Sequence, residues 1–339
     1  MANTGITIVD NIPVTNKTNN NTNNNTQNGT NNNTNNTQPK PPAKVNTKIT
    51  VNSLTSTVGS KVTIKATVVD SKSAKVNTGK VIFTVNNVKI GEANVKNGVS
   101  SLSYVVPESW LKSKLSVKAN YVASGNYLSS SYSSTGIFKI SKGKVKVTLN
   151  KKSLKAKRGQ TITLKANVVD VNNKKVNNGK TVLKINGKTV KGKYVKANVK
   201  KGVATVKYTI PDSYVAKKYN VKVEYSSTYY KTTVAKATLT VQKSPVKIKS
   251  AKVTYKKKKI TVKATLKDYK SKALTKNTKV TIKINGKTVK KNIVCKKGKL
   301  STSFTKKLKK GSYKVQIISA SNSYYNAAKI TKKLKIKAW

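Results

Sequence analysis

Residues that could carry acid–base or metal chemistry are scarce in this chain. Histidine is absent, and eight Asp and Glu residues stand against 71 Lys and Arg. Histidine is the commonest general base, proton shuttle and metal ligand in proteins. Three of the carboxylates, Asp70, Asp170 and Asp268, hold the same place in three related segments. A repeated Asp at the end of a strand favours turn hydrogen bonding over catalysis. We therefore expect no catalytic residue and no cofactor.

Cysteine and metal chemistry are equally limited. A single cysteine excludes intrachain disulfides, and Cys295 takes the place that Val95 and Val199 hold in the related segments, which predicts a buried apolar position. Calcium needs several oxygen ligands, whereas the segments 141–144 and 243–245 offer lysines. We expect no metal site. An isopeptide bond between a lysine and an asparagine or aspartate stays open, with Asp70 or Asp170 as the acid that would assist it.

One strand–turn pattern is written three times. Val68-Val69-Asp70 recurs as Val168-Val169-Asp170 and as Leu266-Lys267-Asp268, and a Lys/Asn-Gly turn follows each, ending at Gly98, Gly202 and Gly298. Six residues after each glycine comes an aromatic residue: Tyr104, Tyr208 or Phe304. A spacing of roughly a hundred residues is the size of one sandwich domain and too long for a solenoid repeat. The pattern predicts a tandem array, which favours spacing, display or binding over catalysis.

Hydrophobic alternation with a period of two predicts strands throughout residues 47–339. Inward positions are expected at Val62, Ile64, Ala66 and Val68, at Ile162, Leu164, Ala166 and Val168, and at Ile260, Val262, Ala264 and Leu266. Asn186-Gly187 and Asn285-Gly286 predict tight hairpins, with Asn86-Asn87 as a looser version. The expected fold is all-β: three tandem Ig-like β-sandwich domains, at 47–141, 142–243 and 244–339. We call these stretches the first, second and third repeat.

Residues 1–46 form an Asn/Thr/Pro-rich segment that has little to bury and is expected to be a disordered linker. Six Asn-x-Thr sequons lie in it, which makes glycosylation candidates of Asn16, Asn20, Asn24, Asn28, Asn32 and Asn35. The start of the chain lacks the pattern of a signal peptide, and no apolar run is long enough to span a membrane. Either the protein is intracellular or this is the C-terminal part of a longer secreted chain; we favour the second.

The net charge is +63, and +61 of it falls on residues 47–339, which contain 68 basic and 7 acidic residues. Almost every basic residue is lysine. Such a field attracts polyanions, and lysine is a hydrated point charge without the fork of arginine. We therefore expect diffuse, salt-sensitive binding to an anionic wall polymer, an acidic glycan or nucleic acid.

The aromatic residues divide into two groups. Inward strand phases predict core or corner positions for Tyr104, Tyr121, Tyr208, Tyr219, Tyr225 and Tyr313. The remaining cluster supplies the aromatic candidates for ligand binding, namely Tyr229, Tyr230, Tyr324 and Tyr325. Lys259, Lys263 and Lys267 follow the outward phase of one strand of the third repeat, and they are the lysine candidates for ligand binding.

These patterns resemble the Ig-like domain repeats of prokaryotic adhesin-like surface proteins, particularly those of methanogenic archaea. The features that carry the resemblance are the Val-Val-Asp strands, the Asn-Gly and Lys-Gly hairpins, the turns Pro107–Trp110 and Pro211–Tyr214, and the Tyr/Ser-rich closing stretches. The third repeat departs from it, because Lys306–Lys310 replaces the proline turn. The resemblance covers residues 47–339 and implies an extracellular role in adhesion or spacing.

We accordingly predict a non-enzymatic, monomeric cell-surface array whose lysine-rich faces bind an anionic wall polymer or acidic glycan. Two alternatives remain. The first is a passive spacer within a larger surface protein. The second is a sequence-independent nucleic-acid binder, although the chain has no zinc-ligand spacing, helix-turn-helix or RNA-binding signature.

Overall fold

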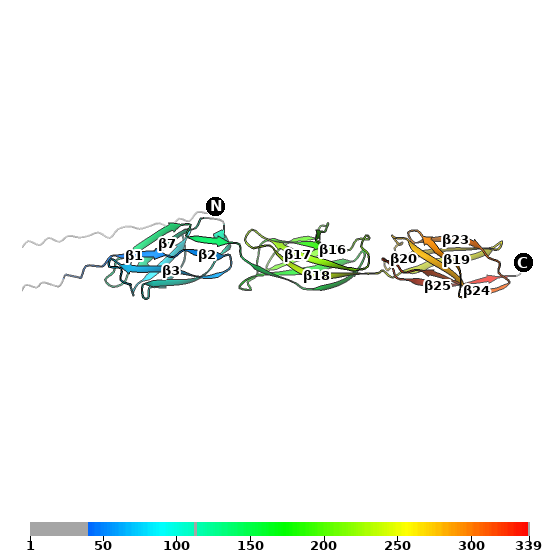
Figure 1. Ribbon diagram of the computed structural model, residues 1–339, viewed down its shortest axis with the longest axis horizontal. Coiled ribbons are helices and arrows are strands. Elements are labelled where there is room, and N and C mark those ends of the chain that lie inside the picture. Colours follow the sequence, from blue (N-terminus) through cyan, green and yellow to red (C-terminus); the bar gives the residue numbers. More distant parts are fainter. Residues whose placement is uncertain (1–39, 112–113, 338–339) are drawn as a thin grey trace, which may run out of the picture. The chain divides into compact units, whose positions relative to one another are not determined.

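The computed structural model describes residues 40–111 and 114–337 (Figure 1). The six sequons and most of the predicted linker, residues 1–39, lie outside the described residues. Among those described, β-strands dominate, and one short 3-10 helix, η1 (Glu108–Leu111), interrupts them. Every sheet takes its strands from one repeat only. The fold is an all-β array of Ig-like sandwiches, as the alternation predicts.

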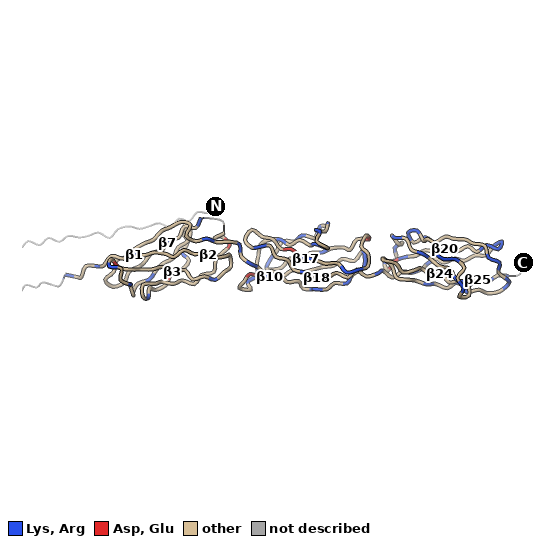
Figure 2. The backbone as a smooth tube through the Cα atoms, in the orientation of Figure 1, with Lys and Arg blue, Asp and Glu red and all other residues tan. Residues whose placement is uncertain are grey.

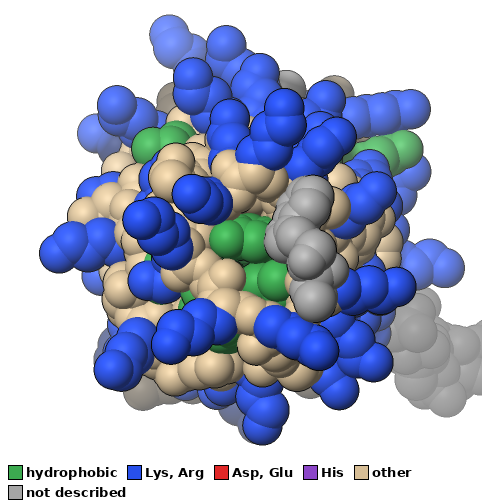
Figure 3. Space-filling view, turned by 90° about the vertical axis from the view of Figure 1, so that its right-hand side faces the viewer, with side chains coloured by type: hydrophobic (Ala, Val, Ile, Leu, Met, Phe, Trp, Pro, Cys, Tyr) green, Lys and Arg blue, Asp and Glu red, His purple; other side chains and the backbone are tan. Residues whose placement is uncertain are grey.

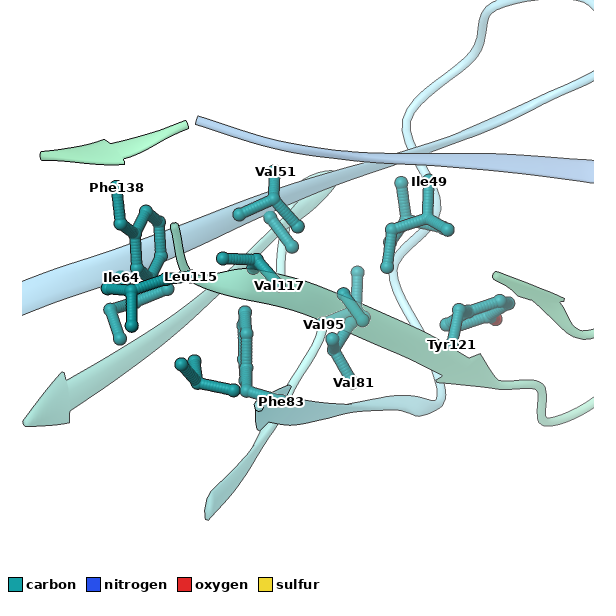
Figure 4. Packing of buried hydrophobic residues seen from close by; sticks show 14 of the residues in the cluster. Ile49, Val51, Ile64, Val81, Phe83, Val95, Leu115, Val117, Tyr121 and Phe138 are labelled. Atoms are coloured by element: carbon teal, nitrogen blue, oxygen red, sulfur yellow. The ribbon is translucent and has the colours of Figure 1, made fainter. Parts of the chain in front are cut away.

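The first repeat packs a three-stranded sheet against a four-stranded one. The strands of the first sheet are β1 (Thr47–Val51), β3 (Lys61–Asp70) and β6 (Val99–Val105). Those of the second are β5 (Val88–Asn94), β4 (Lys80–Val85), β7 (Ser116–Val122) and β8 (Ser130–Thr135), while β2 (Leu54–Thr57) pairs in parallel with β9 (Phe138–Ser141). Val81, Phe83 and Val117 from one sheet and Ile49 and Ile64 from the other meet in the core between them (Figure 4).

The second and third repeats repeat this topology. In the second, one sheet holds β10 (Val145–Leu149), β12 (Thr161–Asp170) and β16 (Val203–Thr209), and the other holds β11 (Ser153–Lys157), β18 (Thr233–Gln242), β17 (Lys218–Ser226), β13 (Lys180–Ile185), β14 (Lys188–Thr189) and β15 (Lys196–Asn198). In the third repeat, one sheet holds β19 (Lys247–Lys256), β20 (Lys259–Lys267) and β23 (Lys299–Thr305). The other sheet holds β22 (Lys287–Cys295), β21 (Thr278–Ile284), β24 (Gly311–Ser319) and β25 (Ala328–Ile336).

The third repeat differs in its first strand. In the second repeat the chain leaves the sheet of β10 and joins the opposite sheet as β11, and in the first it leaves the sheet of β1 and pairs with β9 as β2. In the third, β19 stays beside β20 along its whole length, with a bulge between Lys249 and Lys252. A two-residue turn, Lys257-Lys258, then leads into β20.

Local predictions about turns are confirmed. The Oδ1 atom of Asp70 accepts hydrogen bonds from the backbone nitrogens of Lys72 and Ala74, at 2.9 and 2.8 Å. Asp170 and Asp268 make the same pair of bonds two and four residues onward. Asn186 and Asn285 have φ of 48° and 44°, as the predicted hairpins need. The repeated aspartates are therefore loop anchors.

Predictions about burial hold for most positions. The inward residues of β3, β12 and β20 are buried, apart from Val62, which is half-buried. Tyr121, Tyr208, Tyr219 and Tyr225 are buried, whereas Tyr104 and Tyr313 are half-buried. Cys295 is buried as its repeat position predicts, and burial raises the pKa of its thiol. No lysine is among the buried residues of the described chain.

Where one repeat meets the next, the turn before β3 or β12 contacts tyrosines of the following repeat. Val58 is buried in a cluster with Tyr230. Arg158, the only arginine in the sequence, takes the equivalent position one repeat later. Its guanidinium lies 5.0 Å from the ring centroid of Tyr324 and 4.5 Å from that of Tyr325, and its Nη2 donates to the Tyr324 carbonyl oxygen at 3.1 Å.

This arginine is the buried cation of the described residues, with 5% of its surface exposed. A guanidinium suits the position because it is planar and weakly hydrated, and it stacks on aromatic rings at less desolvation cost than an ammonium. The Tyr269 hydroxyl also donates to the Arg158 carbonyl oxygen at 2.9 Å. Contacts with Tyr269, Tyr324 and Tyr325 therefore tie the second repeat to the third.

We predict that Arg158→Ala lowers the free energy of unfolding by about 1–2 kcal/mol, the scale of a desolvated cation–π contact. Differential scanning calorimetry measures it. Lys155→Ala, an exposed lysine on β11, the strand that precedes the Arg158 turn, is the control and should stay within about 0.5 kcal/mol of the parent. A loss at Arg158 no larger than at Lys155 contradicts the assignment.

We predict that buried tyrosines resist ionisation at alkaline pH. Burial raises the pKa of Tyr121, Tyr225 and Tyr230, so these phenols stay protonated in the folded protein above pH 10, where an unfolded tyrosine ionises. The folded state then binds more protons than the unfolded state, and the tyrosine contribution to the free energy of unfolding falls as pH rises.

The readout for this prediction is tyrosinate absorbance, because it reports the ionised phenol directly, whereas stability sums the contributions of every charged group. In native buffer, part of the tyrosinate signal should be missing until denaturant is added. A full signal without unfolding contradicts the burial of these phenols.

Candidate functional site

Positive charge rises along the repeats (Figure 2). Residues 47–141 contain 12 basic and 3 acidic residues, residues 142–243 contain 26 and 3, and residues 244–339 contain 30 and 1, which gives net charges of +9, +23 and +29. The length of the three stretches is nearly equal, so the third repeat carries the densest charge. Its one carboxylate is Asp268, which anchors a loop.

The predicted lysine candidates lie on the outer surface of one sheet. Lys259 and Lys263 are exposed and Lys267 is half-exposed on β20, whose opposite side is core. The antiparallel register sets each of them directly opposite another lysine on β19: Lys259 faces Lys256, Lys263 faces Lys252, and Lys267 faces Lys247. We call these six residues the lysine face.

Like charges directly opposite each other destabilise a sheet, and the lysine face holds three such pairs. No ion pair of the described residues relieves them, because the three that form involve Glu92 and Glu224 in the first and second repeats. Lysine charges on this face are therefore compensated by solvent and salt only. Such a surface gains most from an external polyanion.

The predicted aromatic candidates do not gather at the lysine face. Tyr230 and Tyr325 are buried, with 5% and 1% of their surface exposed, under the Val58 and Arg158 turns. Neither ring can therefore reach a ligand while these contacts hold. Tyr324 is half-buried beside Arg158. Tyr229 lines a pocket of the second repeat.

This pocket has a volume of about 1060 Å³, and its lining is cationic. Besides Tyr229, its lining includes four lysines, Lys142, Lys180, Lys200 and Lys201, together with asparagines and the hydroxyl residues Ser226, Ser227 and Thr228. No carboxylate is among the lining residues. Ammonium groups beside amides, hydroxyls and an aromatic ring suit a hydroxylated, anionic ligand such as an acidic sugar.

Asn178 organises the pocket wall. Its Oδ1 accepts a hydrogen bond from the Ser227 hydroxyl at 2.6 Å, and its Nδ2 donates to Glu108 of the first repeat at 2.5 Å. The Tyr225 hydroxyl donates to the Asn178 carbonyl oxygen at 3.2 Å. A Cβ at the next residue, Gly179, would lie 2.6 Å from the Tyr225 ring. Glycine is therefore required where this tyrosine closes the wall.

The same arrangement occurs in the first repeat with a smaller pocket of about 510 Å³. There Gly79 lies against Tyr121, whose hydroxyl donates to the Thr78 carbonyl oxygen at 3.0 Å. In the third repeat both partners change together: the strand register places Thr278 at the glycine position and Ser319 at the tyrosine position, and their hydroxyl oxygens lie 3.1 Å apart. The smaller serine leaves room for a Cβ, so the two substitutions compensate each other.

Sequence reasoning therefore identified two surfaces that the fold keeps separate. Lys259, Lys263 and Lys267 lie on the sheet of the third repeat, while Tyr229 lies in the pocket of the second. The pocket lysines were missed, although the repeated Lys-Gly turn that contains Lys200 and Lys201 was visible as a motif. In the described chain, no group of three or more Asp, Glu, Cys or His is placed to hold a metal ion, and no helix is long and apolar enough to cross a membrane.

No family model matches the chain, and no curated protein matches it in sequence. Solved structures that resemble it include a tetra-tandem repeat from the extending region of a large adhesion protein, at 15% identity and TM-score 0.40, covering 86% of this chain and 74% of that one. Titin domains I67–I69 match at 11% identity and TM-score 0.39, covering 87% and 99%. A 1.5-MDa bacterial ice-binding adhesin matches at 15% identity and TM-score 0.28, covering 87% and 98%. At these values the likeness says nothing about a ligand.

We predict that Lys263→Glu raises the free energy of unfolding by about 0.2–1 kcal/mol, because it turns the pair with Lys252 from repulsive to attractive. The control is Lys329→Glu, an exposed lysine that faces Ile318 and changes the net charge equally. Chemical denaturation at low salt measures both. Equal effects in the two variants would mean that only net charge matters and that the cross-strand pair does not.

Proposed function

We propose that this protein is a non-enzymatic, adhesin-like component of the cell surface that binds anionic polymers of the envelope through its lysine face. The observation that supports this most is the set of three directly opposed lysine pairs on β19 and β20, in a repeat with one carboxylate. Repulsion of this kind lowers the stability of the sheet, and bound anions remove it.

The spacing of the lysines favours an extended ligand. Lys259, Lys263 and Lys267 follow each other at intervals of four residues along β20, which is roughly 13 Å per interval at the rise of a β-strand. A small anion can contact one pair at most, whereas a polymer with regularly spaced charges can contact all three. Lysine supplies point charges rather than bidentate contacts, so binding is expected to depend on charge density more than on one chemical group.

The cell-surface location rests on the resemblance to prokaryotic adhesin-like repeats of the methanogen type. We propose an extracellular chain whose three domains span 47–141, 142–243 and 244–339. An anionic wall polymer or an acidic glycan is the partner that such a location supplies. Nucleic acid then binds non-specifically, because the phosphate backbone offers the same regular charge.

The experiment is a binding titration of the full chain on isolated cell-wall polymer and on duplex DNA across a salt series. Half-release from the polymer below about 0.5 M salt is expected, because charges at the surface are screened within a few ångströms at that ionic strength. The triple variant Lys259→Gln/Lys263→Gln/Lys267→Gln should lose affinity. On DNA, its slope of log affinity against log salt should become shallower by up to about 0.9 per lysine that met a phosphate.

A matched control removes three charges from the corresponding sheet of the first repeat: Lys48→Gln/Lys61→Gln/Lys65→Gln. These lysines are exposed on β1 and β3, where Lys48 and Lys61 face valines and Lys65 faces Ser101. The control should bind nearly as the parent does. Equal losses in both triple variants, or binding that ignores salt, would falsify the lysine face as the site. Unchanged polymer binding in both variants would favour a passive spacer, and DNA binding that outlasts polymer binding would favour a nucleic-acid binder.

A further inference from the structure

The third repeat has a pocket of its own, at the turn between β19 and β20. It has a volume of about 540 Å³. Three apolar side chains, Tyr255, Leu308 and Ile336, and four lysines, Lys257, Lys258, Lys310 and Lys337, line it. Figure 3 faces the end of the molecule at which the C-terminus lies and shows hydrophobic side chains in a hollow surrounded by lysines. We call it the end pocket.

The turn that borders the end pocket is strained. Lys257 and Lys258 have φ of 49° and 58°, in the left-handed region that disfavours residues with a Cβ. At the corresponding turns the other repeats have glycines, Gly59 and Gly159, with φ of 81° and 74°. A two-residue hairpin of this kind prefers Asn-Gly, and the chain uses that pair at 186–187 and 285–286. Strained backbone of this sort is typical of functional sites.

The same turn has a different environment in each repeat. In the first two repeats it carries Val58 and Arg158, which are buried against tyrosines of the next repeat. In the third repeat its two lysines are exposed and border the end pocket. The turn that contacts the next repeat in the first two repeats therefore forms the cationic border of a pocket in the third.

Hydrogen bonds position both the lysine turn and the apolar side chains that line the end pocket. The Leu308 backbone nitrogen donates to the Tyr255 hydroxyl at 3.3 Å, which ties the ring to the segment after β23. The Lys306 nitrogen donates to the Lys258 carbonyl oxygen at 2.9 Å and fixes the turn beside that segment. Backbone contacts therefore position the apolar lining of the end pocket, whereas the lysine ammonium groups remain free to bind a ligand.

The lining determines the class of ligand. Four ammonium groups with no carboxylate among the lining residues require an anion. An apolar floor that includes a tyrosine ring suits a ligand with one apolar face, and a sugar ring presents its C–H face in that way. We propose that the end pocket binds an acidic sugar unit, with its carboxylate or phosphate among the lysines and its ring against Tyr255.

This inference rests on the proposed function for the source of the ligand, but its site is a different one. The Lys256–Lys259 pair of the lysine face immediately flanks the turn. A polymer that lies along β20 can therefore place one unit in the end pocket. The lysine face then contributes avidity that depends on charge, and the end pocket contributes selectivity for the sugar.

The test measures binding of the full chain to a galacturonate trimer, to inorganic tripolyphosphate and to a neutral trisaccharide by calorimetric titration. The double variant Lys257→Asn/Lys258→Gly should have a higher Tm than the parent, because Asn-Gly relieves the strained turn. It should bind the galacturonate trimer at least tenfold more weakly. The parent should prefer the galacturonate trimer to tripolyphosphate and should not bind the neutral trisaccharide.

The matched control is Lys296→Gln/Lys297→Asn, at the turn that precedes β23, which the register places at the opposite end of β20. It removes two charges, and Asn97 holds the equivalent of Lys297 in the first repeat. Equal affinity of the two double variants for galacturonate overturns the proposal, as does parental binding of tripolyphosphate that equals or exceeds that of galacturonate. The lysine-face triple variant should keep galacturonate binding while it loses long polymers, so failure of one site is distinguishable from failure of the other.

Discussion

Mutual repulsion of lysines is the constraint on which the rest of this structure depends. A net charge of +63 on 339 residues destabilises any compact state unless the charges stay in water. The β-sandwich meets this requirement because alternate residues of a strand point to opposite faces of the sheet. Lysines follow the outward phase and aliphatic residues the inward phase, as along β20. Among the described residues no lysine is buried, and the buried cation is the guanidinium of Arg158.

The same constraint explains how the repeats diverged. One topology supports net charges of +9, +23 and +29, because added lysines occupy positions that never enter the core. Changes that do involve packing occur in pairs. Thr278 and Ser319 replace the Gly–Tyr pairs of the other repeats together, since either substitution alone would leave a clash or a gap. The number of surface lysines thus differs widely between the repeats, whereas a buried residue changes only together with the residue that it contacts.

The turn that precedes β3, β12 or β20 shows how one position can take three roles. It contributes an apolar contact through Val58, a stacked cation through Arg158, and a strained cationic rim through Lys257 and Lys258. The backbone tolerates all three because the flanking strands fix the turn, and the turn residue itself decides what the end of the sandwich contacts. Both binding sites that we propose therefore lie on exposed strand faces and turns, outside the cores.

Much of the fold was determined by sequence alone, because its signals are local. Alternation defined the buried face of each strand, Asn-Gly defined the hairpins, and the repeated aspartates defined loops that they close over two and four residues. The lysine excess predicts a polyanion partner, and this stays a prediction. Tertiary structure alone decided which charges meet, because strand register and contacts between repeats join residues distant in sequence. It set Lys263 opposite Lys252, buried Tyr230 and Tyr325, and placed Leu308 and Ile336 beside Tyr255 under a ring of lysines.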